Sequence, residues 1–220
     1  MHVRRETLQH ALDQNDLSSI VALVKDNRKV LNQLIRLSYD KETLASWRAI
    51  KAIGLAAKEL VRTDYTYLRE MVRKLLWSLN DESGGIGWSA PEILGEIVSA
   101  DPDQFQDIIP LIAEIYGIEE VIFRPGVMYA LNRIAEAKAE LVLPHKDLMV
   151  RALSDRDPLV RAYALKLVDK MKGFLSRHEL VEINKLANNL SEDASEVWIY
   201  VDNNFKNMQI KELFKSIITD

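Results

Sequence analysis

The chain has 220 residues, of which 48% are hydrophobic, and it carries 29 Lys and Arg against 33 Asp and Glu for a net charge of −4. This apolar fraction excludes a disordered chain, and the length suits one domain or two small ones with a real core. The absence of cysteine excludes disulfides, thiolate nucleophiles and Cys-ligated metal sites. No apolar run approaches the roughly 18 residues that span a bilayer, and no apolar segment follows residues 1–6, so we expect a cytoplasmic protein without a signal peptide or membrane contact.

Helical periodicity runs nearly from end to end. Apolar residues recur at helical spacing at Leu68, Met71, Val72, Leu75 and Leu76. Helix starts are predicted at Asp64, at Pro91, at Asp101-Pro102 and at Asp157-Pro158. No alternating run bounded by hairpin turns stands out, so we predict about a dozen helices and no strands.

The helices repeat along the chain. Segment 47–54 matches segment 88–95 in its Trp, Ala and Gly at an offset of 41 residues. Residues 129–131 match 163–165 at an offset of 34, and 153–155 match 190–192 at an offset of 37, which also places Tyr163 on Tyr200. Periods of this length with two helices each are typical of helical solenoids.

Residues 153–165, Leu-Ser-Asp-Arg-Asp-Pro-Leu-Val-Arg-Ala-Tyr-Ala-Leu, resemble a HEAT repeat, in which Asp-Pro starts the second helix. The resemblance implies an all-α fold, a right-handed α-α superhelix of the HEAT or armadillo type with about five helix-pair repeats. We expect a single domain with an N-terminal helical cap over 1–33, repeats over 34–205 and a C-terminal capping helix over 206–220. Such caps need a polar outer face, because no neighbouring repeat covers them.

A second, narrower resemblance covers residues 77–92. Their Asn-Asp-Glu-Ser-Gly-Gly-x-Gly-Trp-x-Ala-Pro-Glu pattern is similar to that of a small HEAT-like family of anaerobic bacteria and archaea. That family has no assigned activity, so the resemblance marks a place in the chain without naming a chemistry.

Charge is distributed unevenly along the chain. Residues 41–74 hold eight basic and four acidic residues, whereas residues 75–123 hold no Lys, Arg or His. Ten acidic residues lie in that second block: Asp81, Glu82, Glu92, Glu96, Asp101, Asp103, Asp107, Glu114, Glu119 and Glu120. Either adjacent repeats neutralise each other across their interface, or the block forms an acidic face for a basic partner or a cation.

A Gly-rich segment over residues 80–88 interrupts the helices. Its backbone N–H groups are suited to an anion and its carboxylates to a cation, whereas the structural alternative is a turn pinned by two core tryptophans. The candidate binding residues are Trp77, Asn80, Asp81, Glu82, Ser83, Gly84, Gly85, Gly87, Trp88 and Glu92, together with Arg124, Tyr129 and Arg133 of the next repeat. Arg124 and Arg133 either face Asp81, Glu82 or Glu92, or form ordinary salt bridges between repeats.

Known motifs fail on this segment and elsewhere. No Lys-Ser/Thr follows the glycines, and the segment follows a helix, so neither a P-loop nor a dinucleotide fingerprint fits. A calcium loop starting at Asp81 lacks an oxygen ligand at position 5 and glycine at position 6. The four histidines, His2, His10, His145 and His178, form no zinc motif and no supported triad. We therefore predict no cofactor and no metal. Trp47 and Trp198 are expected in the core, and Arg161 is expected to pair with Asp155 or Asp157.

Three functions stay open at this point. The first is a non-enzymatic interaction scaffold that binds the basic segment of a protein partner through the acidic central repeat and the Gly-rich loop. The second is a small-molecule or metal-binding module at the 80–88 loop.

The third is a HEAT-like alkylpurine DNA glycosylase, a family that carries a Trp and, four residues on, an acidic residue on a concave helix. Trp88 and Glu92 reproduce that spacing, with Glu in place of the family's Asp. DNA binding needs Lys and Arg to neutralise phosphates, and this stretch has none, so we do not expect nucleic acid as a ligand.

Overall fold

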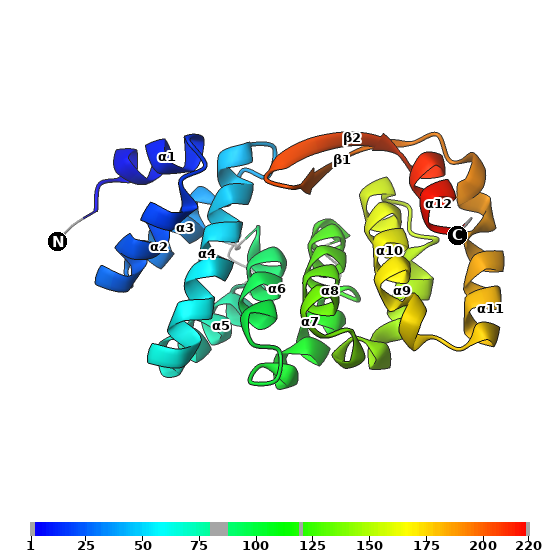
Figure 1. Cartoon of the computed structure of the whole chain (residues 1–220), viewed down its shortest axis with the longest axis horizontal. Helices are drawn as coiled ribbons and strands as arrows, with labels where there is room; N and C mark the ends of the chain where they lie inside the picture. The colour runs from blue at the N-terminus through cyan, green and yellow to red at the C-terminus, as the bar shows by residue number, and fades with distance from the viewer. Residues whose placement is uncertain (1–2, 80–87, 119–120, 219–220) are drawn as a thin grey trace.

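Helices dominate the computed structural model, which describes residues 3–79, 88–118 and 121–218 (Figure 1). Six helices lie in the first half: α1 (Arg5–Asp13), α2 (Leu17–Asp26), α3 (Val30–Leu37), α4 (Leu44–Thr63), α5 (Tyr65–Ser78) and α6 (Ala90–Ala100). Six follow: α7 (Ile109–Ile115), α8 (Arg124–Lys138), α9 (Lys146–Ala152), α10 (Pro158–Met171), α11 (Arg177–Ala187) and α12 (Ile210–Ile218). The short 3-10 helices are η1 (Gln106–Ile108), η2 (Val121–Phe123), η3 (Ala139–Leu141), η4 (Leu143–His145), η5 (Lys172–Phe174) and η6 (Asn188–Glu192).

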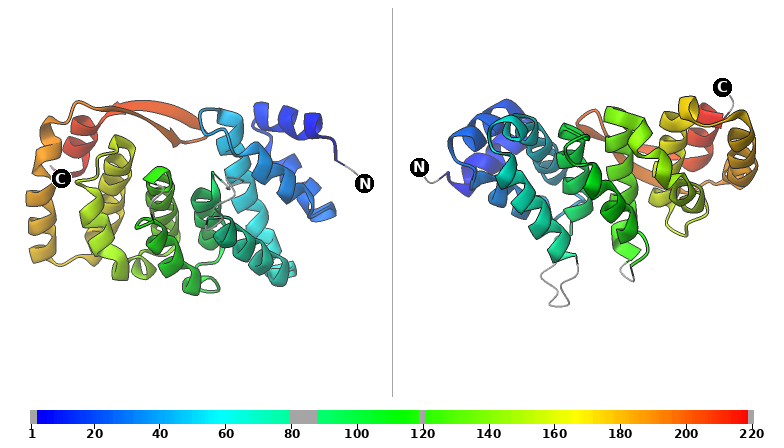
Figure 2. Two further views of the ribbon diagram at one scale, coloured as in Figure 1. Left: turned by 180° about the vertical axis from the view of Figure 1, so that it is seen from behind. Right: turned by 90° about the horizontal axis from the view of Figure 1, so that it is seen from below.

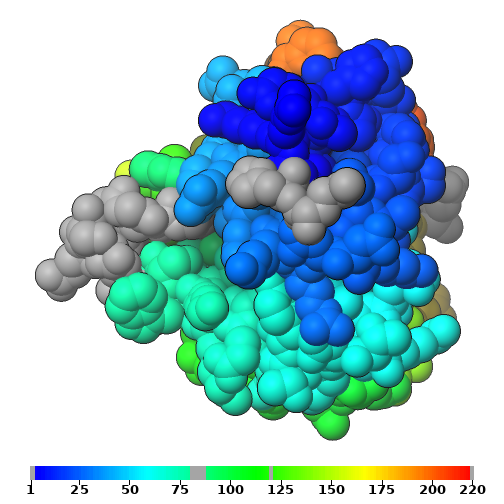
Figure 3. Space-filling view, turned by 90° about the vertical axis from the view of Figure 1, so that its left-hand side faces the viewer, coloured from blue at the N-terminus to red at the C-terminus, as the bar shows by residue number. Residues whose placement is uncertain are grey.

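The helices stack in two layers. Helices α4, α6, α8 and α10 lie side by side, with α6 packed between α4 and α8, and α5, α7 and α9 lie behind them (Figures 1 and 2). Helices α1 to α3 cover one end of the stack, which faces the viewer in Figure 3, and α11 and α12 lie at the other end. Each helix therefore buries its apolar face against neighbours in its own layer and in the other layer. The prediction of a dominantly helical fold is confirmed.

Several helix starts agree with the sequence prediction. Asp64 caps α5, Asp157 caps α10 directly before Pro158, and Pro91 lies in the first turn of α6. The expectation at Asp101-Pro102 is wrong, because turns and η1 follow this pair and α7 begins only at Ile109.

The predicted absence of strands is also wrong. Strand β1 (Glu196–Val201) pairs antiparallel with β2 (Asn204–Gln209), with Val201 opposite Asn204. Asp202 and Asn203 form the two-residue turn with φ of 54° and 62°, the left-handed conformation that such hairpin turns require. The predicted boundary between repeats and cap at 205/206 falls inside β2, and the capping helix is confined to α12.

The hairpin spans the stack as a bridge. It runs along the N-terminal ends of α6 and α8, from α10 and α12 to the start of α4 (Figure 1). The ring of Tyr200 in β1 stacks on that of Trp47 in α4, with ring centroids 5.2 Å apart and planes 16° from parallel. The hairpin thus links the two halves of the chain and covers the first turns of the inner helices.

No helix among the described residues is both long enough and apolar enough to cross a membrane.

Candidate functional site beneath the hairpin

Helix α6 carries two carboxylates into the interior. Every residue from Ala90 to Ser99 is buried, and Glu92 and Glu96 are only 2% and 3% exposed. Because they are four residues apart, both side chains lie on one face of the helix. Part of the block without basic residues is therefore a central buried helix, and two of the ten acidic residues of the block are internal.

Two glycines in the flanking helices make room for these carboxylates. A Cβ added at Gly54 in α4 would lie 2.5 Å from Glu96 Oε2, and one added at Gly126 in α8 would lie 2.7 Å from the Glu92 carboxylate. Both separations are shorter than real Cβ contacts, so a larger residue at either position would displace the carboxylate that lies there.

Three donors converge on one oxygen of Glu96. Its Oε1 accepts hydrogen bonds from the Tyr129 hydroxyl at 2.6 Å, from Arg133 Nε at 2.7 Å and from Lys51 Nζ at 3.0 Å. Burial, and then the Glu96 carboxylate, raise the pKa of Tyr129 well above its ordinary value, so this hydroxyl stays a donor. This network locks α4, α6 and α8 together.

Glu92 is only half satisfied. Its Oε1 accepts from Lys41 Nζ at 2.9 Å, whereas its Oε2 is buried without a hydrogen-bond partner. The residue lies in the first turn of α6, where the helix dipole favours a negative charge. A buried carboxylate oxygen that lacks a donor is costly and marks a place where a ligand can supply one.

Glu92 lines a cavity of about 540 Å³ beneath the hairpin, which we call the hairpin cavity. Four aromatic residues contribute to its walls: Trp47, Tyr163, Trp198 and Phe205. Its charged lining residues are Lys41 against Glu42, Glu92 and Asp157, so negative charge dominates. Tyr163 is buried and its hydroxyl also lacks a hydrogen-bond partner. The volume falls in the range of small-ligand pockets.

The residues predicted as a site do not all come together. Asn80, Asp81, Glu82, Ser83, Gly84, Gly85 and Gly87 lie outside the described residues. Trp77 is 71% exposed and Trp88 is 41% exposed, so the interpretation in which two core tryptophans pin the turn is wrong. Neither tryptophan lines the hairpin cavity, whereas Glu92 does.

The arginines predicted near the loop form salt bridges with other elements. Arg124 pairs with Asp155 at 3.2 Å, and Arg133 pairs with Glu96, and also with Glu136. The expectation that Arg161 pairs with Asp155 or Asp157 is wrong, since its carboxylate partner is Asp193 at 2.8 Å. Its Nη1 donates to the backbone carbonyl of Asp155 instead.

Neighbouring elements supply the missing positive charge of the acidic block. Among its described acidic residues, four pair with cations: Glu92 with Lys41, Glu96 with Lys51, Asp103 with Lys138 and Asp107 with Arg69. Of the two open interpretations of the charge pattern, neutralisation between repeats accounts for these four residues.

Three further predictions concern the glycosylase spacing, a metal site and the two tryptophans Trp47 and Trp198. Trp88 precedes the Ser89 N-cap of α6, so Trp88 and Glu92 do not share a helix as the glycosylase spacing requires. No group of three or more metal-ligating side chains occurs in the part of the chain that the structure describes. The expectation of a core Trp47 is confirmed, whereas that for Trp198 is wrong, because Trp198 is 63% exposed.

One sequence signal for the site was present. Tyr129, Tyr163 and Tyr200 recur at offsets of 34 and 37, and all three join one aromatic cluster around Trp47. Lys41 carried no such signal, because the loop before α4 meets α6 only in the folded chain.

The buried tyrosines predict a loss of stability at alkaline pH. Burial raises the pKa of Tyr163 far above its ordinary value, and burial raises the pKa of Tyr200 to about 12. The unfolded chain ionises its tyrosines near pH 10, so their stabilising contribution is complete below about pH 10 and is lost as the pH rises further. We expect Tyr163→Phe to keep wild-type stability at pH 7 and to reduce the decline above pH 10 by up to about 1.4 kcal/mol per pH unit. Urea unfolding at pH 7 to 11 measures both, and an unchanged alkaline slope would contradict the assignment.

Comparisons with known proteins give little beyond this. No family model and no curated protein matches the chain. A search of solved structures finds an archaeal HEAT-like repeats protein from Thermococcus onnurineus NA1, with 15% sequence identity, 99% of each chain covered and a TM-score of 0.38. A likeness this weak carries no argument, so the description of the fold rests on the helices themselves.

Proposed function

We propose that this chain is a non-enzymatic, cytoplasmic interaction protein that takes a basic side chain of a protein partner into the hairpin cavity. The observation that carries the proposal is the buried Oε2 of Glu92, which lacks a hydrogen-bond donor at a cavity walled by aromatic rings. A guanidinium or ammonium group supplies both the N–H and the positive charge that this oxygen needs.

The surroundings of Glu92 support a cation over other ligands. Among the described residues that line the cavity, Lys41 is the one with a positive charge, and its Nζ already binds the other oxygen of Glu92. The exposed ring of Trp198 offers a face on which a cation or a planar guanidinium can stack. An anion, by contrast, would meet Glu42, Glu92 and Asp157.

The wider architecture belongs to the same proposal. We take the helix pairs as about five HEAT-type repeats of a right-handed superhelix, a class of fold that presents long surfaces to partners. The Gly-rich loop directly precedes α6 in the chain, and we propose that it also binds the partner segment.

Binding of short peptides tests the proposal. The probes are capped pentapeptides with Arg, Lys or Glu between four glycines, and calorimetry measures their affinities. We expect the Arg and Lys peptides to bind and the Glu peptide not to bind, and we expect Glu92→Gln to weaken binding about tenfold or more because the charge is lost while the shape is kept. Equal affinity for all three peptides, or unchanged binding by Glu92→Gln, would overturn the proposal. If methylguanidine bound as tightly as the Arg peptide, the ligand would be a small guanidinium compound and not a protein partner.

A pair of exposed tryptophans provides a matched control. Trp198→Ala removes an aromatic wall of the hairpin cavity, and Trp77→Ala removes an even more exposed ring that lies outside it. We expect Trp198→Ala to weaken the Arg peptide about fivefold to tenfold, which corresponds to roughly 1 kcal/mol of stacking, and Trp77→Ala to leave the affinity unchanged. Both variants should unfold at the wild-type temperature, because neither side chain is buried. Equal effects of the two variants on binding would refute the role of Trp198.

A further inference from the structure

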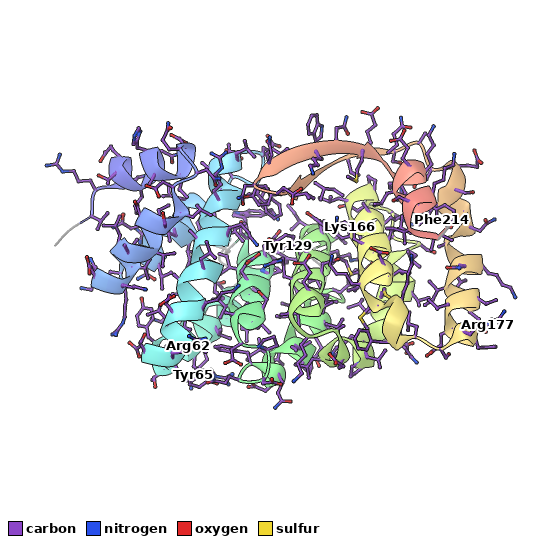
Figure 4. The ribbon with its side chains drawn as sticks, viewed as in Figure 1. Arg62, Tyr65, Tyr129, Lys166, Arg177 and Phe214 are labelled. Atoms are coloured by element: carbon purple, nitrogen blue, oxygen red, sulfur yellow. The ribbon has the colours of Figure 1, made fainter. Side chains whose placement is uncertain are left out.

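A second cavity lies on the other side of Tyr163. It has a volume of about 280 Å³ and lies between α8, α10 and the turn of the hairpin, so we call it the turn cavity. Tyr163 lines both cavities, and the turn residues Asp202 and Asn203 line this one. Tyr129 and Lys166, which also line it, are labelled below the hairpin in Figure 4.

Positive charge is in excess around the turn cavity. The cations are Lys51, Arg133 and Lys166 in its lining, with Lys170 and Lys206 beside them, and the carboxylates are Glu96, Glu136 and Asp202. These carboxylates bind Lys51, Arg133, Lys170 and Lys206, and the nearby Asp169 pairs with Lys172. Among the described residues, no carboxylate pairs with Lys166, so this lysine is left with a free charge.

A buried polar atom at the same cavity lacks a partner. Asn132 is held in place because its Nδ2 donates to the carbonyls of Met128 at 2.9 Å and Tyr163 at 2.8 Å. Its Oδ1, which can only accept, has no donor, and the residue is more than nine-tenths buried. The cavity therefore offers a cation and a separate acceptor that no described residue satisfies.

Burial disfavours the charged form of the lysines around the turn cavity. Burial lowers the pKa of Lys166, and the charge of Lys170 lowers it further, while Asp169 and Asp202 act in the opposite direction. Burial likewise lowers the pKa of Lys51 and of Lys170. A bound anion would offset both the burial and the repulsion among these groups.

We propose that the turn cavity binds a phosphate group that retains one proton. Its charged oxygens accept hydrogen bonds from Lys166 Nζ, and its remaining O–H donates to Asn132 Oδ1. Sulfate carries no proton near neutral pH and cannot make this last bond, so the cavity discriminates between the two anions. This site is separate from the cation site, and its test uses different ligands.

Calorimetry at constant ionic strength with inorganic phosphate, glycerol phosphate and sulfate tests the proposal, at about pH 5 so that the ester also keeps one proton. We expect phosphate to bind about tenfold or more tightly than sulfate, because a buried acceptor facing an unprotonated oxygen is strongly unfavourable. Tighter binding of glycerol phosphate would identify a phosphate ester as the natural source, and tighter inorganic phosphate would identify the free ion. Either result supports the site, whereas no binding of phosphate, or equal binding of sulfate, overturns it.

Two lysine variants make the test specific. Lys166→Met removes the free charge and keeps the length of the side chain, and we expect it to weaken phosphate about tenfold or more. Lys185→Met is the matched control, because Lys185 is an exposed lysine of α11 at the far end of the stack, and it should bind phosphate like the wild type. Equal affinity in Lys166→Met and the wild type would overturn the assignment. Asn132→Ala should reduce the preference for phosphate over sulfate, and this change in ratio is one that mere loss of stability would not produce.

Discussion

Replacing Gly95 with alanine is expected to lower the free energy of unfolding by about 3 kcal/mol. Gly95 lies in α6 where this helix crosses α8, and an added Cβ would lie 2.4 Å from the Cα of Ala130 and 2.6 Å from its Cβ. The Cα belongs to the backbone, so no change of rotamer relieves the clash, and the two helices must move apart. Because α6 is buried from Ala90 to Ser99, that movement disturbs contacts on both of its sides.

Thermal and urea unfolding measure this effect, with Gly173→Ala as the control. Gly173 lies in η5, where an added Cβ meets nothing within 4 Å. We expect Gly173→Ala to stay within about 0.5 kcal/mol of the wild type. A loss of 3 kcal/mol in a chain of this size lowers the unfolding temperature by roughly 6 to 12 °C. If Gly95→Ala and Gly173→Ala unfolded together, the close packing of α6 on α8 would be contradicted.

The helical stack was predictable because its signals are local. The Asp157-Pro158 pair both caps and opens α10, and Asp64 caps α5, as expected from residues that bind backbone N–H groups within a few positions. The match of 47–54 with 88–95 also has a structural meaning, since Gly54 and Gly95 are both sites where neighbouring residues leave no room for a Cβ.

The hairpin was not predicted because only one of its two strands has a clear strand pattern in the sequence. Strand β1 contains Val197, Ile199 and Val201 in alternation, which is a normal strand pattern. Strand β2 is mostly polar and none of its residues is buried, and the turn uses Asp202 and Asn203 without the glycine that usually identifies a two-residue turn. The matching offset from Tyr163 to Tyr200 made a helix repeat the more natural interpretation.

The site was predicted only in part, because it depends on contacts distant in sequence. Glu92 was among the candidates, but its partner Lys41 lies 51 residues away, and the cavity exists only because the hairpin returns to the start of α4. The charge pattern pointed to the segment that contains α6. It allowed two interpretations, neutralisation between repeats or an acidic face. Pairing of Glu96 with Lys51 and Arg133, which no local pattern encodes, identifies this carboxylate as internal.

The second large effect is expected for Glu96→Ala, which should lower the free energy of unfolding by about 3 kcal/mol. The substitution leaves the buried Tyr129 hydroxyl without its acceptor and leaves Lys51 and Arg133 facing each other without the carboxylate between them. The side chains of Lys51 and Arg133 are 22% and 24% exposed, so water relieves part of the penalty, and the value falls at the lower end for a broken buried ion pair.

Urea unfolding of three further variants separates this network from a general loss of packing. Glu114→Ala removes an exposed carboxylate of the same acidic block and should cost less than about 0.5 kcal/mol. Glu96→Gln keeps the volume and an acceptor for Tyr129 but removes the charge, so it should fall between Glu96→Ala and the wild type. Tyr129→Phe should cost about 1 kcal/mol, and its cost should shrink once Glu96 is already alanine, since the two residues share one hydrogen bond. Strict additivity of Tyr129→Phe and Glu96→Ala would show that the two residues act independently, and the carboxylate would then not be the group that ties α8 to α6.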